Sequence, residues 1–225
     1  MDDLIAKGLA SLLALLIAMA SAIFAAAGTI HYWQAWLFLL AYFSASLIIS
    51  VDLMRTDRAL LQRRMKGGPF AEREPTQRLI MTIVSVGFVA LLVVPGLDRR
   101  FGWSRMPGVI AIVGDLLVLL GFGGVLRVFR ENSFAAATID LAPDQTVIAT
   151  GPYAIVRHPM YAAALVMMTG IPVALGSWWG LCVLAAMLPT LIWRLLHEER
   201  VLAARLTGYR DYQMRVRWRL IPSVW

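Results

Sequence analysis

Long apolar runs, separated by short charged segments, dominate the first half of the chain. Four runs are long enough to cross a membrane as helices, which takes about 20 mostly apolar residues. They cover residues 4–27, 32–53, 79–97 and 107–126. The pattern therefore predicts four membrane-spanning helices within residues 1–126.

A fifth apolar stretch, residues 159–193, contains no Asp, Glu, Lys or Arg. It is too long for one span and about right for two closely packed helices. We place the break in "PVALGSWWG", where Pro172, Gly176 and Gly180 weaken a helix and Trp178 and Trp179 suit a membrane interface. The expected fold class is an all-α polytopic membrane bundle with four spans plus a C-terminal helical hairpin. Whether the hairpin crosses the bilayer fully stays open.

The composition agrees with a multi-pass integral membrane protein. Hydrophobic residues make up 60% of the chain and charged residues 16%, against about 45–50% and about 25% in soluble domains. We expect no cleavable signal peptide, because two acids open the chain and the first apolar run is long enough to span. Cys182 is the one cysteine and lies in an apolar run, so neither a disulfide within the chain nor a thiolate nucleophile is expected. No metal-ligand spacing, P-loop, dinucleotide fingerprint or nucleophile elbow is present, so no metal site is predicted.

The basic residues predict the orientation in the membrane. The formal net charge is +7, and Lys and Arg cluster in residues 54–78 and in the tail after Trp193. With four spans and a returning hairpin, both clusters fall on one side, and only Arg99, Arg100 and Arg105 fall opposite. The positive-inside rule then places both termini in the cytoplasm, and it explains the charge without a nucleic-acid partner. Frequent Ala and Arg point to a bacterial inner membrane.

The first candidate for chemistry is "GPYAIVRHPMY", residues 151–161. Pro159 fits the first turn of a helix, and the free N–H groups of that turn suit a carboxylate or phosphate. Arg157 and His158 would flank this position. Anchoring at the membrane interface is the alternative, and these residues alone leave both open.

The second candidate is "IWRLLHEERVLAARL", in which Arg194 and Glu198 share one helix face and Glu199 follows. Solvated charges on an emerging helix are the plain alternative. The hairpin topology favours a site, because it makes residues 157–161 and 193–199 the two cytoplasmic ends of one helical pair.

Three further features of the sequence stand apart from these two candidates. Tyr209 and Tyr212 lie in the basic tail "GYRDYQMRVRWRLIPSVW", which either lies on the anionic leaflet or covers a site. Asp115 lies inside the fourth apolar run, where an acid is costly and a functional candidate. We favour a buried helix-packing hydrogen bond for Asp115 and a structural role for His31.

These segments, taken in order, resemble the isoprenylcysteine carboxyl methyltransferase family. The resemblance rests on "GPYAIVRHPMY", a hairpin, "R…EE", "Y..Y" and "RLIP", and it covers about residues 145–225. Phospholipid N-methyltransferases share this pattern. The apolar runs assign residues 1–126 to transmembrane helices 1–4, and the resemblance implies that 127–225 form the catalytic region. The first four spans carry no such signature.

The resemblance implies an S-adenosylmethionine site at the cytoplasmic membrane face. Arg194 would face the methyl acceptor and Glu198 would bind the cofactor, both as catalytic residues, and Tyr209 and Tyr212 would contact the acceptor. The sequence departs from the family pattern between Glu199 and Tyr209, where it is one residue shorter than the common form and has "LTGY" in place of a Gly-acid-acid-Tyr type. The implied cofactor-binding set is Gln145, Thr146, Val147, Ile148, Tyr153, His158, Pro159, Met160, Tyr161, Glu198 and Glu199.

The expected function is S-adenosylmethionine-dependent methyl transfer to a lipophilic or lipidated acceptor at the bilayer, of the isoprenylcysteine carboxyl O-methylation type. The alternatives are lipid amine N-methylation, thiol S-methylation, an NADPH-dependent sterol-reductase-like enzyme, since "RLIP" is also similar to that group, and a non-catalytic membrane scaffold. The acceptor and the oligomeric state are left open.

Overall fold

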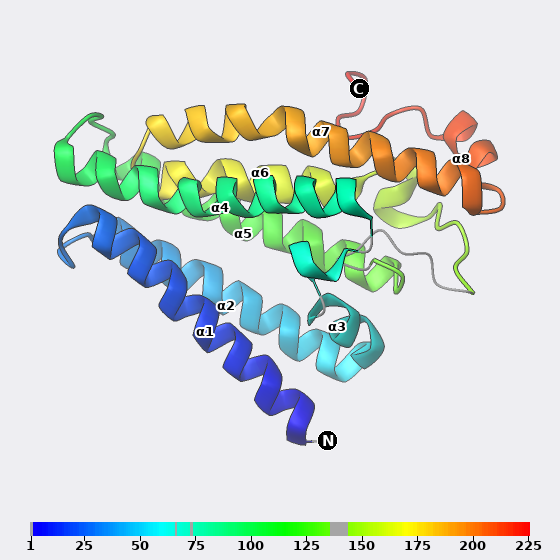
Figure 1. Ribbon diagram of the computed structural model, residues 1–225, viewed down its shortest axis with the longest axis horizontal. Coiled ribbons are helices and arrows are strands. Elements are labelled where there is room, and N and C mark those ends of the chain that lie inside the picture. The colour runs from blue at the N-terminus through cyan, green and yellow to red at the C-terminus, as the bar shows by residue number, and fades with distance from the viewer. Residues whose placement is uncertain (1, 66, 73, 136–143) are drawn as a thin grey trace.

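The protein is a bundle of helices, described here by a computed structural model that covers residues 2–65, 67–72, 74–135 and 144–225. No strand occurs in these ranges, which confirms the all-α fold class (Figure 1). The helices, in chain order, are α1 (Asp2–Ala27), α2 (Trp33–Thr56), α3 (Arg58–Met65), η1 (Pro69–Ala71), α4 (Pro75–Phe101), α5 (Gly108–Glu131), η2 (Gly151–Ala154), α6 (Pro159–Ala174), α7 (Trp179–Arg205) and α8 (Tyr209–Arg215).

Five of these helices are long and apolar enough to cross a membrane: α1, α2, α4, α5 and α7. The first four contain the four spans predicted from the sequence. The returning arm of the hairpin, α7, is also a full span. Its partner α6 has only 16 residues, about 24 Å at 1.5 Å per residue, against a bilayer core of about 30 Å.

The hairpin turns at residues 175–178, inside the predicted stretch. Gly176 has a φ of 71°, a left-handed conformation that glycine adopts without strain. Pro172 stays within α6 and Gly180 within α7, so the turn is shorter than the sequence suggested. The Tyr32 hydroxyl donates to the Leu175 carbonyl, and the Ser177 hydroxyl donates to Asp98 at 2.5 Å. These bonds hold the turn against α2 and α4.

Helices α5 and α6 pack backbone to backbone along a seam of small residues. A Cβ added at Gly114 would lie 2.1 Å from the Ala174 nitrogen, and one added at Gly170 would lie 2.7 Å from the Gly114 carbonyl oxygen. Small residues allow such close approach between membrane helices. The seam fixes where α6 begins relative to α5, and thereby positions the site at its N-terminal end.

Asp115 lies beside this seam but does not make the predicted hydrogen bond. The residue is 5% exposed, and neither carboxylate oxygen has a partner within the described residues. The expectation of a packing hydrogen bond is therefore wrong. Van der Waals contact between small residues, rather than a polar bond, joins the helices here.

The start of α1 and the short helices α3 and α8 lie toward the same end of the bundle, and the C-terminus lies over α7 (Figure 1). The charged loop before α4 reaches the second half of α7 there, since Glu72 binds Arg194 and Glu74 lies 2.8 Å from His197. Arg99, Arg100 and Arg105 belong to the opposite end, around the connection from α4 to α5. Lys66 and Arg73, which were counted in the basic loop, lie outside the described residues, as do residues 136–143 of the predicted catalytic region.

The seam yields a test of the packing. Gly114→Ala forces a methyl group into the α6 backbone, and overpacking of this kind costs about 1–3 kcal/mol. Its apparent unfolding temperature, followed by circular dichroism in detergent, should fall. Gly123→Ala is the matched control on the same helix, because an added Cβ there would meet no other described residue within 4 Å beyond its chain neighbours and its own helix backbone. Equal unfolding temperatures for both variants would contradict the described seam.

Candidate functional site

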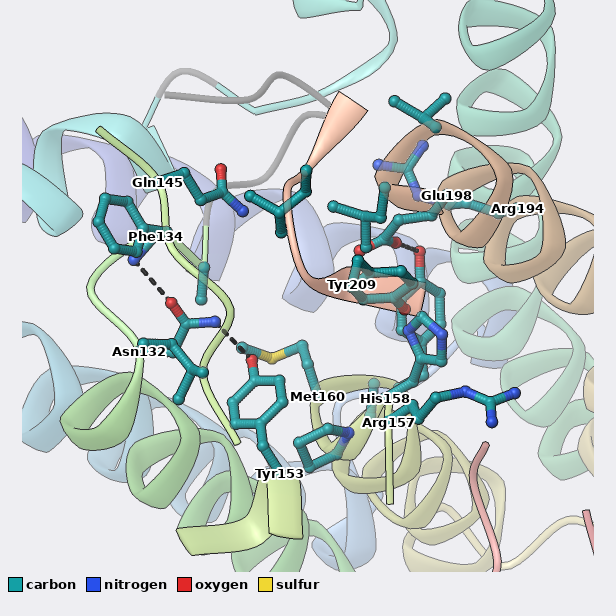
Figure 2. A pocket seen from close by; sticks show the side chains of 18 of the residues that line it. Asn132, Phe134, Gln145, Tyr153, Arg157, His158, Met160, Arg194, Glu198 and Tyr209 are labelled. Atoms are coloured by element: carbon teal, nitrogen blue, oxygen red, sulfur yellow. Dashed lines mark hydrogen bonds between the residues drawn. The ribbon is translucent and has the colours of Figure 1, made fainter. Parts of the chain in front are cut away.

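A cavity of about 420 Å³ opens among the ends of the helices near α3 and α8. It lies between the end of α5, the strip 144–148, the start of α6, the end of α7 and α8. Figure 2 shows Gln145, Asn132 and Tyr153 on one side of it and Arg194, Glu198 and Tyr209 on the other. The lining includes the predicted residues Gln145, Thr146, Val147, Ile148, Tyr153, His158, Pro159, Met160, Tyr161, Arg194, Glu198, Tyr209 and Tyr212.

Pro159 is the first residue of α6, as predicted, and His158 precedes it at the N-cap position. Arg157 also contributes to the lining, but its guanidinium points away from the cavity (Figure 2). It donates to Glu199 Oε1 at 2.7 Å and to the carbonyls of Val216 and Arg217, each at 2.9 Å. Arg157 is thus neither an interfacial anchor nor an anion ligand, because it holds the C-terminal segment against the bundle.

Glu199 lies behind the cavity wall instead of lining it. Its carboxylate accepts from Arg157 and, at 2.9 Å, from Arg219, and it lies 3.2 Å from His158 Nε2. Three basic side chains from two segments, the approach to α6 and the segment after α8, therefore surround one buried acid on α7. This geometry explains why Glu199, predicted beside the cofactor, is turned away from the cavity.

The two ends of the hairpin meet as the topology predicted. The Tyr161 hydroxyl donates to Glu198 Oε2 at 2.6 Å, and the His158 and Tyr161 rings are in edge contact with centroids 5.7 Å apart. Both Tyr161 and Glu198 line the cavity. The Glu198 carboxylate is therefore held in a fixed direction at the cavity wall.

Arg194 lines the cavity and has two partners that the sequence analysis missed. Its Nη2 donates to Glu72 Oε1 and its Nη1 to Gln77 Oε1, each at 2.9 Å. All three side chains are buried. The sequence does set Glu72 apart, because it and Glu74 are the acids of the otherwise basic stretch 58–78. Spacing alone cannot reveal that its partner lies 122 residues away.

Asn132 and Phe134 are further lining residues without a sequence signal. The Asn132 side chain donates to the Tyr153 hydroxyl at 2.8 Å and accepts from the Phe134 backbone N–H at 2.8 Å (Figure 2). Burial raises the pKa of Tyr153 to about 12, although the Asn132 hydrogen bond opposes the shift. Tyr153 is therefore a neutral phenol at physiological pH.

Tyr209 and Tyr212 differ in the use of their hydroxyls. Tyr212 donates to the Tyr153 carbonyl at 2.8 Å, whereas the buried Tyr209 hydroxyl has no partner within the described residues. Burial, and then the nearby Glu199 and Glu198, raise the pKa of Tyr209, so it remains a hydrogen-bond donor. Helix α8 packs on the cavity wall through a cluster with Val147 and Leu202. The tail is thus part of the site and is not simply laid on the leaflet.

The cavity lies mostly within a stretch that matches a known family. Residues 109–207 match the family described as phospholipid methyltransferase. The match confirms the resemblance seen in the sequence and supports a membrane methyltransferase. It runs from α5 to the end of α7 and stops before Tyr209.

One curated relative is the cobalt-zinc-cadmium resistance protein CzcN of Cupriavidus metallidurans. It is 31% identical over 119 residues, which cover 51% of this chain and 53% of that protein. The chain thus matches about half the length of this relative.

The contacts of Glu199 yield a stability prediction. Glu199→Gln leaves buried cations without their counterion, and breaking such a pair costs about 3–5 kcal/mol. The variant should unfold at lower denaturant in detergent, and trypsin should cut sooner within the segment after α8, because Arg157 and Arg219 lose their shared carboxylate while Arg157 keeps its bonds to the Val216 and Arg217 carbonyls. Asp3→Asn removes an exposed ion pair with Lys7 and should change neither measurement. Wild-type behaviour of Glu199→Gln would contradict the role given to this network.

Proposed function

We propose that the protein transfers a methyl group from S-adenosylmethionine to a lipophilic acceptor at the membrane surface, as in isoprenylcysteine carboxyl O-methylation. One observation carries the proposal. One cavity borders both the strip 145–148, which begins with the polar Gln145 and Thr146, and the ends of the hairpin helices. A water-soluble cofactor and a bilayer-borne acceptor could therefore meet in it.

The cavity residues fit S-adenosylmethionine chemically. The volume lies within the roughly 300–1,000 Å³ of small-molecule sites. Glu198 offers a carboxylate to a cationic ligand, Gln145 offers an amide, and Phe134 and Tyr153 offer aromatic rings. When bound, the cofactor would supply an electrophilic methyl group on a sulfonium. The chain's own residues would bind it, orient it and exclude water.

The other part of the cavity fits a lipophilic acid. Met81, Val84 and Leu191 belong to helices α4 and α7, which are long enough to span the bilayer, so they offer an apolar wall to a lipid chain. Arg194 lines the same cavity and can donate charge-assisted hydrogen bonds to a carboxylate. Such an acceptor is already ionised at neutral pH, so no protein group has to remove a proton.

The charge distribution supports a cytoplasmic site. The cavity lies at the end of the bundle that carries the basic loop before α4 and the basic tail, and the positive-inside rule assigns that end to the cytoplasm. We place the protein in a bacterial inner membrane with both termini on that side.

Lipid amine N-methylation is the second candidate. The description of the matched family names phospholipids as what is methylated. In addition, Glu72 already offsets the charge of Arg194. An uncharged or basic acceptor would therefore meet no excess positive charge from this pair. Glu198 could then accept the proton that an amine releases on methylation.

A binding and transfer experiment tests the proposal. Purified protein in detergent is titrated calorimetrically with S-adenosylmethionine and with NADPH. Tritiated methyl transfer is then measured with a prenylated cysteine, with phosphatidylethanolamine and with a long-chain thiol. We expect binding of S-adenosylmethionine and labelling of the prenylated cysteine. Labelling of the amine or thiol alone would select that alternative, binding of NADPH alone would indicate a reductase, and binding of neither would indicate a scaffold.

The proposed roles predict a split in kinetics. Arg194→Ala should lower kcat by about 10- to 100-fold, the loss expected for a hydrogen bond to a charged group, with little change in the Kd for S-adenosylmethionine. Glu198→Ala and His158→Ala should raise that Kd more than they lower kcat. Calorimetry and initial rates give the two quantities, and wild-type kinetics in all three variants would rule out this site.

The two tyrosines give a matched pair. Tyr209→Phe removes a hydroxyl that has no partner among the residues the structure describes, so kcat/KM for the acceptor should fall about 5- to 10-fold with unchanged stability. Tyr212→Phe breaks the bond to Tyr153 and should lower stability by about 1 kcal/mol with a smaller effect on kcat/KM. A larger loss of kcat/KM in Tyr212→Phe than in Tyr209→Phe, with stability lost in Tyr209→Phe, would contradict the role proposed for Tyr209.

A further inference from the structure

We propose that Glu72 and Gln77 are positioning residues, which fix the Arg194 guanidinium in the orientation that receives the acceptor. The inference rests on the proposed function. It adds two residues from outside both the matched family region and the motifs of the C-terminal half, namely the loop before α4 and the first turns of α4.

The contacts reach both terminal nitrogens of Arg194. Nη1 donates to Gln77 and Nη2 to Glu72, each at 2.9 Å. Glu72 is 4% exposed, Gln77 is 1% exposed and Arg194 is 8% exposed. A planar guanidinium held at both terminal nitrogens cannot rotate freely about its side-chain bonds. Arg194 is therefore a directed donor group and not a mobile cation.

The two partners lie behind Arg194 and are themselves held in place. Arg194 belongs to the cavity lining, whereas Glu72 and Gln77 do not. Pro75 begins α4 and thereby fixes the turn that carries Gln77, and Arg78 donates to the Glu72 carbonyl at 3.3 Å. The pair can thus affect a ligand only through Arg194, which is the arrangement expected of a supporting shell.

The charge of Glu72 also weakens the electrostatic field of Arg194. Two charges close together in a poorly hydrated site interact far more strongly than in water, so the Glu72 carboxylate offsets most of the long-range field of Arg194. What remains toward the cavity is short-range hydrogen bonding, which depends on angle and distance. Arg194 should therefore discriminate acceptors by fit more than by net charge.

A neighbouring ion pair provides a control that distinguishes positioning of Arg194 from simple attachment of the loop to α7. Glu74 Oε2 lies 2.8 Å from His197 Nε2 and joins the same loop to α7. Neither Glu74 nor His197 lines the cavity, and Glu74 is half exposed. Glu74→Gln is therefore a matched control, which weakens the attachment of the loop without touching Arg194.

The test is a double-mutant cycle measured by tritiated methyl transfer, with the acceptor of the panel above that the wild type labels. We expect Glu72→Ala and Gln77→Ala to lower kcat about 10- to 100-fold, because displacing a reacting group by about 1 Å can cost about 100-fold. Glu72→Gln keeps an acceptor oxygen and should lose less. The Kd for S-adenosylmethionine should stay within about 2-fold, and Glu74→Gln should match the wild type.

The cycle then asks whether Glu72 acts through Arg194. In an Arg194→Ala background, Glu72→Ala should cause no further loss of kcat, since interacting residues are not additive. A further loss equal to that of the single variant would overturn the inference, as would full activity of Glu72→Ala. A wild type that labels no acceptor would overturn the proposed function, and the inference with it. Unchanged calorimetric binding of S-adenosylmethionine shows that each variant is folded.

Discussion

The site depends on one buried carboxylate. Glu199 accepts from Arg157 and Arg219 and contacts His158, so it joins α7, the approach to α6 and the segment after α8. Without this carboxylate, the buried charge of Arg157 would be costly. Because the acid and its partners belong to three separate segments, this one network fixes those segments relative to one another.

Most basic side chains near the cavity are therefore committed to the fold. Arg157 binds Glu199 and two carbonyls, and Arg194 binds Glu72 and Gln77. The groups that line the cavity and carry the proposed ligand contacts are the Glu198 carboxylate, the Tyr209 hydroxyl and the Arg194 guanidinium, which Glu72 and Gln77 hold. Under the proposed function, such a site would select a ligand by geometry more than by net charge.

The spans, the hairpin turn and the meeting of residues 157–161 with 193–199 could be predicted from the sequence, because each follows from local hydropathy and chain connection. The partners of Arg194 could not, since Glu72 and Gln77 are more than 110 residues away. The different positions of Glu198 and Glu199 relative to the cavity could not be predicted either. The two residues are adjacent in sequence, yet about 100° apart around the helix, so one lines the cavity and the other lies behind it.

The shortness of α6 has a consequence for depth. Its 16 residues reach only about 24 Å, and Trp178 in the turn and Trp179 at the start of α7 are side chains suited to a membrane interface. With these tryptophans at the far interface of a bilayer core of about 30 Å, the start of α6 at Pro159 would lie several ångströms below the near interface. Under the proposed function, the floor of the cavity would then lie at the depth of the acyl chains, and a lipid headgroup would reach it without the lipid leaving its leaflet.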